Sequence, residues 1–454
     1  MKHLKSLTYL AFSVSMLSAC TKTDNPIPDP PPPSPTDTVV TGSLTTNKTL
    51  TADKKWILKG YVYVTNGVTL TIEPGTTVMS DVTDKGALCI ERGGKIMAEG
   101  TAEKPIVFTS GKAVGSRAPG DWGGIVLLGR ARTNRSSTPV IEGGLDRPYG
   151  GTDDADNSGV MKYVRIEYAG IAAFANSEIN ALTLGAVGSG TTLEYIQTAY
   201  ANDDAYEFFG GKVNAKHLVA AYTADDDYDF DFGFTGKIQY AVALRDPAFV
   251  DPGDAGNGIE SDNDGSGTAA LPYTRPVLSN FTFVGPNNAP GTAANHNFNA
   301  RFRRASRFAV GNTIMMGYMD AGLSQESDST GQAFASGLSV FSNNIVHAVA
   351  NPYWIPSSSG TPTIKPEILS IAGMQTLAEA AGSIVYPSAA DIKLKAPFNL
   401  TAPDLTPDAG SPALTGAAYT GDFADAFFTS GTYKGAIGST NWLNGWTRFF
   451  ANGQ

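Results

Sequence analysis

The chain has 454 residues, of which 42% are hydrophobic and 17% charged, so it can build a substantial core. Its formal net charge is -10. This acidic balance argues against a nucleic-acid partner, because proteins that bind nucleic acids normally carry a basic patch that contacts phosphates.

The first residues have the composition of an export signal. Basic residues precede an apolar run over residues 7–17, which is too short to span a membrane. The run ends in Leu-Ser-Ala-Cys at residues 17–20, which resembles the bacterial lipobox whose cysteine is lipidated. We predict a lipoprotein signal peptide over residues 1–19 and a membrane anchor on the lipidated Cys20. An ordinary secretory signal with an incidental cysteine is the alternative.

Residues 20–41 are predicted to be a linker. Their proline-rich centre cannot build a core and favours an extended spacer between the anchor and the folded part. Cys89 is the only other cysteine. No neighbouring base would activate it, so we expect a small packed side chain.

Short strands begin at about residue 42. Residues 68–72, Val-Thr-Leu-Thr-Ile, alternate apolar and polar side chains as a strand does. An offset of 18 would place Leu70 over Leu88 and Ile72 over Ile90. Repeats of roughly 20 residues, each too small to bury its own apolar face, indicate a solenoid. Because no helical stripe separates the strands, the sequence predicts an all-β, single-stranded parallel β-helix over residues 42–350.

Two long segments, residues 130–159 and 246–274, are rich in Gly, Asp, Asn and Pro. They are predicted to be loops that fold over one lateral face of the solenoid. Asn280, Asn312 and Asn344 recur at intervals of 32, and we expect them to be stacked turn residues.

Residues 351–454 are predicted to form a short helix and a cap region packed on the β-helix. The helix is expected over residues 365–381, where Pro366 and Glu367 stand at a plausible start. The end of a solenoid exposes its core and needs a cap. The aromatic residues near the C-terminus are expected to supply that packing rather than a platform for sugars; they are Trp442, Trp446, Phe449 and Phe450.

Several motifs resemble a known family. Residues 67–76 (Gly-Val-Thr-Leu-Thr-Ile-Glu-Pro-Gly-Thr), residues 120–125 (Gly-Asp-Trp-Gly-Gly-Ile) and the Trp-Leu-Asn-Gly-Trp ending are similar to Bacteroidetes-type surface lipoproteins with a pectate-lyase-like β-helix. The resemblance implies a right-handed coil and a lipid-anchored location in the outer membrane, facing the cell exterior. It implies no particular activity, because that family has no established function.

Two acidic segments carry the candidate site. Residues 202–211 and 224–233 repeat at an offset of 22, which stacks Asp203 on Asp225 and Glu207 on Asp229. Adjacent coils lie about 4.8 Å apart, so these carboxylates repel one another unless a cation, shared protons or arginine partners compensate. Calcium would suit such oxygen ligands. The predicted Ca²⁺ ligands are Asp203, Asp204, Glu207, Asp226, Asp227, Asp229 and Asp231.

Two classes of function remain open on these residues. The preferred one is a non-catalytic surface module that holds an extended glycan or a partner protein, assisted by Ca²⁺. The alternative is an enzyme: a glycoside hydrolase with paired carboxylates, or a polysaccharide lyase with calcium and an arginine base. Its candidate catalytic residues are Asp204, Glu207, Asp229 and Arg301. Acids that merely specify the corners of coils are a third, purely structural interpretation.

Overall fold

The computed structural model describes residues 37–174 and 177–454. The predicted signal peptide, the lipid anchor on Cys20 and most of the linker lie outside the described residues. The first strand, β1, begins at Asp37, so the end of the predicted linker is wrong. Residues 37–41 already pair with residues 55–59 of the next coil.

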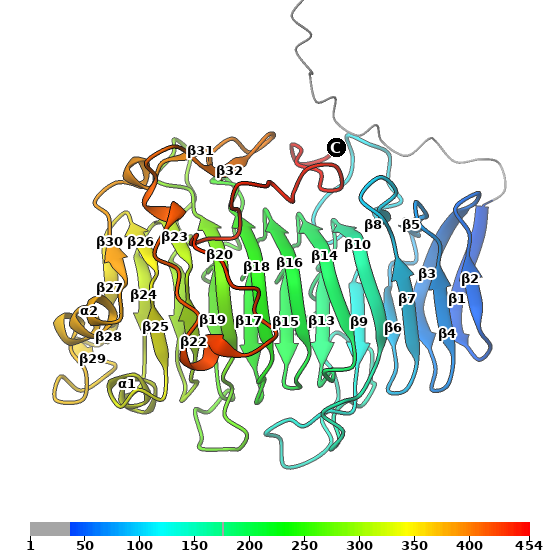
Figure 1. Ribbon diagram of the computed structural model, residues 1–454. Helices are drawn as coiled ribbons and strands as arrows, with labels where there is room; N and C mark the ends of the chain where they lie inside the picture. Colours follow the sequence, from blue (N-terminus) through cyan, green and yellow to red (C-terminus); the bar gives the residue numbers. More distant parts are fainter. Residues whose placement is uncertain (1–36, 175–176) are drawn as a thin grey trace, which may run out of the picture.

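Most strands belong to one continuous parallel sheet that winds into a solenoid (Figure 1). Each coil contributes strand segments to three faces, and the longer strands bend at a corner and serve two of them. The all-β parallel β-helix predicted from the sequence is confirmed, and it continues past residue 350, because β27 and β30 still pair with preceding coils.

Face 1 of the solenoid contains β1 (Asp37–Leu44), β3 (Lys55–Val64), β5 (Thr77–Ser80), β8 (Ile106–Thr109), the second halves of β10 (Gly159–Glu167), β14 (Thr192–Ala199), β16 (Asn214–Ala221), β18 (Lys237–Leu244) and β20 (Val277–Val284), then β23 (Ile314–Tyr318), β26 (Ile345–Ala348) and β30 (Ile384–Val385). Face 2 contains the ends of β1 and β3, then β6 (Ala87–Ile90), β9 (Gly124–Leu128), β13 (Leu182–Gly185), β15 (Tyr206–Phe209), β17 (Tyr228–Asp231), β19 (Ile259–Ser261), β21 (Phe298–Phe302), β24 (Ala321–Gln325) and β27 (Asn351–Trp354). Face 3 contains β2 (Lys48–Leu50), β4 (Thr69–Ile72), β7 (Lys95–Glu99), the first halves of β10, β14, β16, β18 and β20, then β22 (Ala309–Gly311) and β25 (Val340–Ser342).

The register confirms one predicted repeat and corrects the other. Glu207 pairs with Asp229 between β15 and β17, as the offset of 22 predicts. Leu70, however, pairs with Ile96 rather than with Leu88. The offset of 18 is therefore wrong: β4 and β6 lie on different faces of the solenoid. They look alike in sequence because every face buries alternate residues.

The corner between faces 3 and 1 is built by residues in the left-handed conformation. Asn280 and Asn312 have φ angles of 58° and 56°, as expected of stacked turn residues. The third such residue is Asn343 rather than Asn344. Asn344 instead accepts a hydrogen bond from the backbone N–H of Thr313, at 2.9 Å.

The first predicted loop lies outside the coils, whereas part of the second belongs to a coil. The residues between β9 and β10 form one long loop on face 2, in which an isolated antiparallel bridge joins Val140 and Pro148. The second predicted loop is broken by β19, which pairs with β17 and brings Glu260 into register with Asp229. A two-stranded ribbon, β11 (Ala172–Phe174) and β12 (Ser177–Glu178), also projects from a corner.

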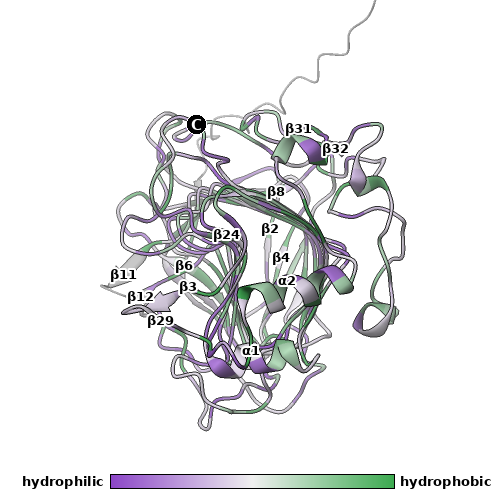
Figure 2. Cartoon of the chain, turned by 90° about the vertical axis from the view of Figure 1, so that its left-hand side faces the viewer, coloured by the Kyte–Doolittle hydropathy of each residue, from purple (hydrophilic) through white to green (hydrophobic). Residues whose placement is uncertain are grey.

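Two helices lie toward the C-terminal end of the solenoid (Figure 1). α2 (Ile371–Ala380) starts later than predicted, because the side chain of Ser370 caps it by accepting a hydrogen bond from Gly373 N–H. It buries Met374 and Ala378 in the main core. Figure 2, viewed from that end, shows α2 over the interior that the coils enclose. α1 (Asp328–Ala335) was not predicted.

The C-terminal segment runs back along the side of the solenoid instead of capping its end (Figure 1). The hairpin of β28 (Ser357–Ser358) and β29 (Thr361–Pro362) still lies at the end of the solenoid, beside α2 (Figure 1). After α2 the chain passes through the hairpin of β31 (Leu394–Ala396) and β32 (Asp404–Pro407) and three short 3-10 turns. The hydroxyl of Tyr200 donates to the carbonyl of Phe450 at 3.0 Å, and Trp446 is buried against Tyr195. The aromatic residues thus pack on the solenoid, as predicted, but on its lateral face. Among the described residues, the helices are too short and too polar to cross a lipid bilayer.

Candidate cation-binding cleft

Four aromatic residues of the two repeats point into the core, away from the outward acidic residues; they are Tyr206, Phe208, Tyr228 and Phe230. Tyr206 stacks on Tyr228 in the core with ring centroids 5.2 Å apart, and Phe208 stacks on Phe230 at 5.0 Å. Because successive side chains of a strand alternate in direction, the intervening Glu207 of β15 points outward on face 2. These four aromatic residues are therefore core residues and do not contact a ligand, whereas Phe209 and Phe232 pack outside the main core, in the cluster under the long loop.

Glu207 belongs to a column of residues in register along face 2. From the N-terminal end, the column consists of Tyr63, Cys89, Val126, Thr183, Glu207, Asp229, Glu260, Arg301, Ser324 and Trp354. Cys89 is fully buried under the loop, as a packed side chain is expected to be, and burial raises the pKa of its thiol. The column changes from apolar to acidic at the middle of the solenoid.

A second set of acids precedes the face 2 strands, at the corner where each coil turns. Asp204 accepts a hydrogen bond from the backbone N–H of Asp226 in the next coil, at 2.8 Å. Asp226 in turn accepts one from the N–H of Asn257, at 2.6 Å. One oxygen of each corner acid thus joins neighbouring coils, which is the structural role considered for them. The remaining carboxylate oxygens are not used in this way.

The two sets of acids converge on one cleft of about 180 Å³, here called the acidic cleft. All of its lining residues except Asn180 are acidic: Glu142, Glu178, Asp203, Asp204, Glu207, Asp225, Asp226, Asp229, Asp254 and Glu260. Glu142 and Asp254 come from the two long loops and Glu178 from β12. These three residues, Asp225 and Glu260 were not among the predicted ligands.

Two groups of three carboxylates have a geometry suited to a metal ion. In each group the oxygens lie within 4.8 Å of one another: Asp203, Asp204 and Asp225 form one, and Asp204, Glu207 and Asp229 form the other. Asp204 belongs to both. Hard oxygen ligands of this kind are what Ca²⁺ prefers, with backbone carbonyls and water completing six to eight ligands.

The carboxylates of the cleft resist ionisation. Burial, followed by the charge of neighbouring acids, raises the pKa values of Asp204, Glu207 and Asp229 well above their usual range. Burial raises the pKa of Asp203 to about 7. At neutral pH the cleft therefore stores unfavourable electrostatic free energy, which a bound cation would relieve.

Two predicted ligands lie elsewhere. Asp227 points away from the cleft into a fully buried ion pair, 3.0 Å from Arg245 Nε, and accepts a hydrogen bond from the Tyr318 hydroxyl at 2.7 Å. Its charge is compensated within the fold, so it is not free to bind a cation. Asp231 follows Asp229 by two residues on β17 and does not line the cleft. Its carboxylate accepts a hydrogen bond from the N–H of Phe232.

Arginines form ion pairs with acids at the C-terminal side of the cleft. Arg301 donates to Glu326 at 2.7 Å and to Glu260 at 3.1 Å. Arg303 binds Asp262 at 3.0 Å and also contacts Glu260. Burial lowers the pKa of Arg301, but Glu260 and Glu326 outweigh burial and raise it, whereas an arginine that acts as a base must lose its proton. The arrangement gives no support to the predicted catalytic role of Arg301.

The geometry defines a parallel β-helix protein with an acidic cleft on one lateral face. A comparison with models of known protein families matches a pectate-lyase like beta helix domain over residues 42–374. That match covers most of the chain, so the protein belongs to this family. Neither the comparison with curated proteins nor the one with solved structures found a match.

Proposed function

We propose that this protein is a lipid-anchored, non-catalytic binding module whose acidic cleft holds a divalent cation, Ca²⁺. The observation that supports the proposal is the lining of the cleft: two carboxylate triplets share Asp204, and none of the described residues that line the cleft is cationic. Shared protons neutralise such a set up to the raised pKa values of its carboxyls, and above those values a cation is the remaining compensation.

An extended glycan is the partner that best suits the surroundings of the cleft. At Asp254 the acidic cleft adjoins a second cavity, of about 370 Å³. Asn295, Asn297 and Phe298 line this cavity. Amides that exchange hydrogen bonds with hydroxyls, next to an aromatic ring, suit the mixed polar and apolar surface of a sugar. A bound Ca²⁺ with open positions would add a ligand for sugar oxygens.

The proposed location follows from the predicted lipobox. A lipid on Cys20, followed by a proline-rich spacer, would hold the β-helix at the outer membrane facing the cell exterior. Metabolic labelling with an alkyne fatty acid tests this anchor. Label is expected on the native protein and absent from Cys20→Ser, whereas equal labelling of both would contradict the anchor.

Calcium titration of protein stripped with EDTA tests the cleft. The native protein is expected to bind Ca²⁺ and to gain thermal stability. Asp204→Asn keeps the hydrogen bond to Asp226 but removes a charge from both triplets, so it should weaken Ca²⁺ binding by at least about tenfold. Glu103→Gln, an exposed acid outside the cleft, is the matched control. If chelation changes neither melting temperature nor binding, the calcium proposal fails.

A glycoside hydrolase is the second candidate, because a carboxyl with a raised pKa next to another carboxylate can act as a general acid. Glu207 and Asp229 have that relation. Acidic and neutral polysaccharides incubated with the protein, with and without EDTA, distinguish the two functions. New reducing ends, or unsaturated products if the protein is a lyase, would overturn the non-catalytic proposal. Binding without either supports it.

A further inference from the structure

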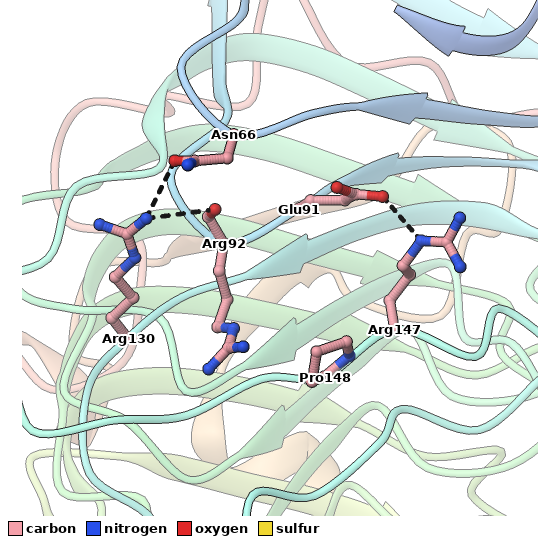
Figure 3. A pocket seen from close by; sticks show the side chains of 6 residues that line it. All are labelled: Asn66, Glu91, Arg92, Arg130, Arg147 and Pro148. Atoms are coloured by element: carbon pink, nitrogen blue, oxygen red, sulfur yellow. Dashed lines mark hydrogen bonds and ion pairs between the residues drawn. The ribbon is translucent and has the colours of Figure 1, made fainter.

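A second charged pocket lies on the N-terminal half of the solenoid, and its charge is opposite to that of the acidic cleft. The pocket, of about 450 Å³, is lined by Asn66, Glu91, Arg92, Arg130, Arg147 and Pro148. Figure 3 shows three arginine side chains around it, with Arg92 between Arg130 and Arg147. We call it the arginine pocket. It shares no lining residue with the acidic cleft.

Three separate segments bring these arginines together. Arg92 lies in the corner between β6 and β7, Arg130 follows β9 in the next coil, and Arg147 comes from the long loop after β9. The sequence of the corner permits the approach. Gly93 has a φ of 82°, and a Cβ there would lie 2.1 Å from the Asn66 side chain and 2.3 Å from Arg130 Nη2.

Each guanidinium group is held in place but keeps donors unused. Arg92 donates from Nη1 to the carbonyl of Gly150 at 3.0 Å, and Arg130 donates from Nη2 to Asn66 at 3.0 Å. Arg147 donates from Nε to Glu91 at 2.6 Å and lies over the Tyr63 ring, 4.2 Å from its centroid. A guanidinium has five N–H donors, so most of those on Arg92 and Arg130 have no hydrogen bond among the described residues.

The charges of the pocket do not cancel. Three arginines face one acid, Glu91, which is already paired with Arg147. Like charges brought together in this way repel one another. An anion would turn the repulsion into attraction, as a cation would in the acidic cleft.

We propose that the arginine pocket binds a tetrahedral oxyanion, a phosphate or sulfate group. A planar carboxylate is matched by one guanidinium fork, whereas forks from three segments suit an anion with more than two accepting oxygens. The lining residues carry a surplus of two positive charges, which attracts a dianion even though Asp156 offsets part of the charge of Arg130. The pocket has room for the group and part of a molecule that carries it. This site is separate from the proposed cation site and does not depend on it.

Calorimetric titration of the full-length protein with sodium sulfate and with sodium phosphate tests the proposal. Ionic strength is held constant with sodium chloride, and EDTA is present so that no divalent cation binds in the acidic cleft. Saturable binding at one site per chain is expected. Arg92→Gln and Arg130→Gln should each weaken it by at least about tenfold, since each removes charged hydrogen bonds. Arg132→Gln, an exposed arginine of the same loop paired with Asp154, should leave it unchanged.

A neutral substitution separates a built site from diffuse attraction. Asn66→Ala keeps the net charge but releases Arg130, so binding should weaken several-fold while melting temperature stays within a few degrees. If Asn66→Ala binds sulfate as the native protein does, or if all three arginine variants lose affinity equally, the proposal is overturned. Acetate that binds as tightly as sulfate would overturn the tetrahedral assignment.

The same titration identifies the source of the anion. If a sugar 6-phosphate or a sulfated monosaccharide binds more tightly than the free ions, the pocket takes a substituent of a sugar. If inorganic phosphate or sulfate binds more tightly, the free oxyanion is the ligand. Both results support the pocket, whereas no saturable binding of any of these four probes overturns it.

Discussion

Two adjoining parts of face 2 solve the same electrostatic problem differently. In the acidic cleft, Glu207 and Asp229 follow each other in the column, and no described basic side chain lines the site. One coil further, Glu260 and Asp262 meet Arg301, Arg303 and Arg304 in a network of ion pairs. The register is continuous from one part to the other.

The difference shows which acids the fold needs and which await a ligand. In the arginine network, acids serve structure and bring their own counter-charges. In the cleft, the backbone uses only some of the carboxylate oxygens at the corners, and no described basic side chain lines the cleft beside the outward acids of β15 and β17. The charge of Arg303, in the neighbouring network, offsets only part of the repulsion at Asp229. A fold that needed only corners would not require Glu207 or Asp229 to be acidic.

The largest expected effect comes from removing an arginine of the network. Arg303→Met leaves Glu260 and Asp262 with fewer counter-charges in a mostly buried setting, so we expect a loss of about 2–4 kcal/mol in the free energy of unfolding. Urea denaturation measures it. Arg307→Met is the matched control, since Arg307 lies over the Tyr273 ring outside the network. Equal effects of both substitutions would mean that the network is not what stabilises this region.

Removing an acid from the cleft should raise the free energy of unfolding instead of lowering it. In calcium-free protein at pH 8, Asp229→Asn removes repulsion from Glu207 and Glu260, and we expect a gain of about 1 kcal/mol in stability. The same urea denaturation measures it. With saturating Ca²⁺ the order should reverse, because the variant has lost a ligand. Destabilisation of the calcium-free variant would show that the cleft is a structural feature instead.

The sequence predicts the fold better than it predicts the site. Alternating strands and the repeat at an offset of 22 are local patterns. Because β15 and β17 lie in consecutive coils of the same length, their register follows directly from the offset. The offset of 18 failed because alternation is the same on every face and cannot tell strands of one face from strands of another. A longer repeat unit, compared over several coils, would have separated them.

The site depends on geometry that the sequence does not express. Asp226 and Asp227 are neighbours in a run of acids, yet one lines the cleft and the other forms a buried pair with Arg245. The conformation of the corner decides between them. Glu142 and Asp254 reach the cleft from long loops, for which no repeat gives a position. The only available signal was the concentration of acids in loops next to acidic coils.

Changing the pH should change the stability of the protein through the carboxyls of the acidic cleft, without any substitution. A carboxyl whose folded pKa is raised favours folding when it is protonated, and this advantage is lost as the pH rises from its unfolded pKa to its folded pKa. For Asp203 that window runs from about 4 to about 7. Calcium-free protein should therefore be more stable to urea at pH 5 than at pH 8, and Ca²⁺ should reduce the difference by stabilising the protein at pH 8. A calcium-free protein that gains stability from pH 5 to pH 8 would contradict the raised pKa values.

The smallest expected effect comes from placing a basic side chain among the acids of the cleft, as in the arginine network. Glu142 lines the cleft from an exposed position of the loop, so Glu142→Lys can introduce a cation without disturbing the core. The lysine should stabilise calcium-free protein by about 0.5 kcal/mol, the scale of an exposed ion pair, and weaken Ca²⁺ binding several-fold by competing for the same carboxylates. Glu142→Gln separates the removal of the acid from the addition of the cation. If Glu142→Lys binds Ca²⁺ as tightly as Glu142→Gln does, the ion sits away from this side of the cleft.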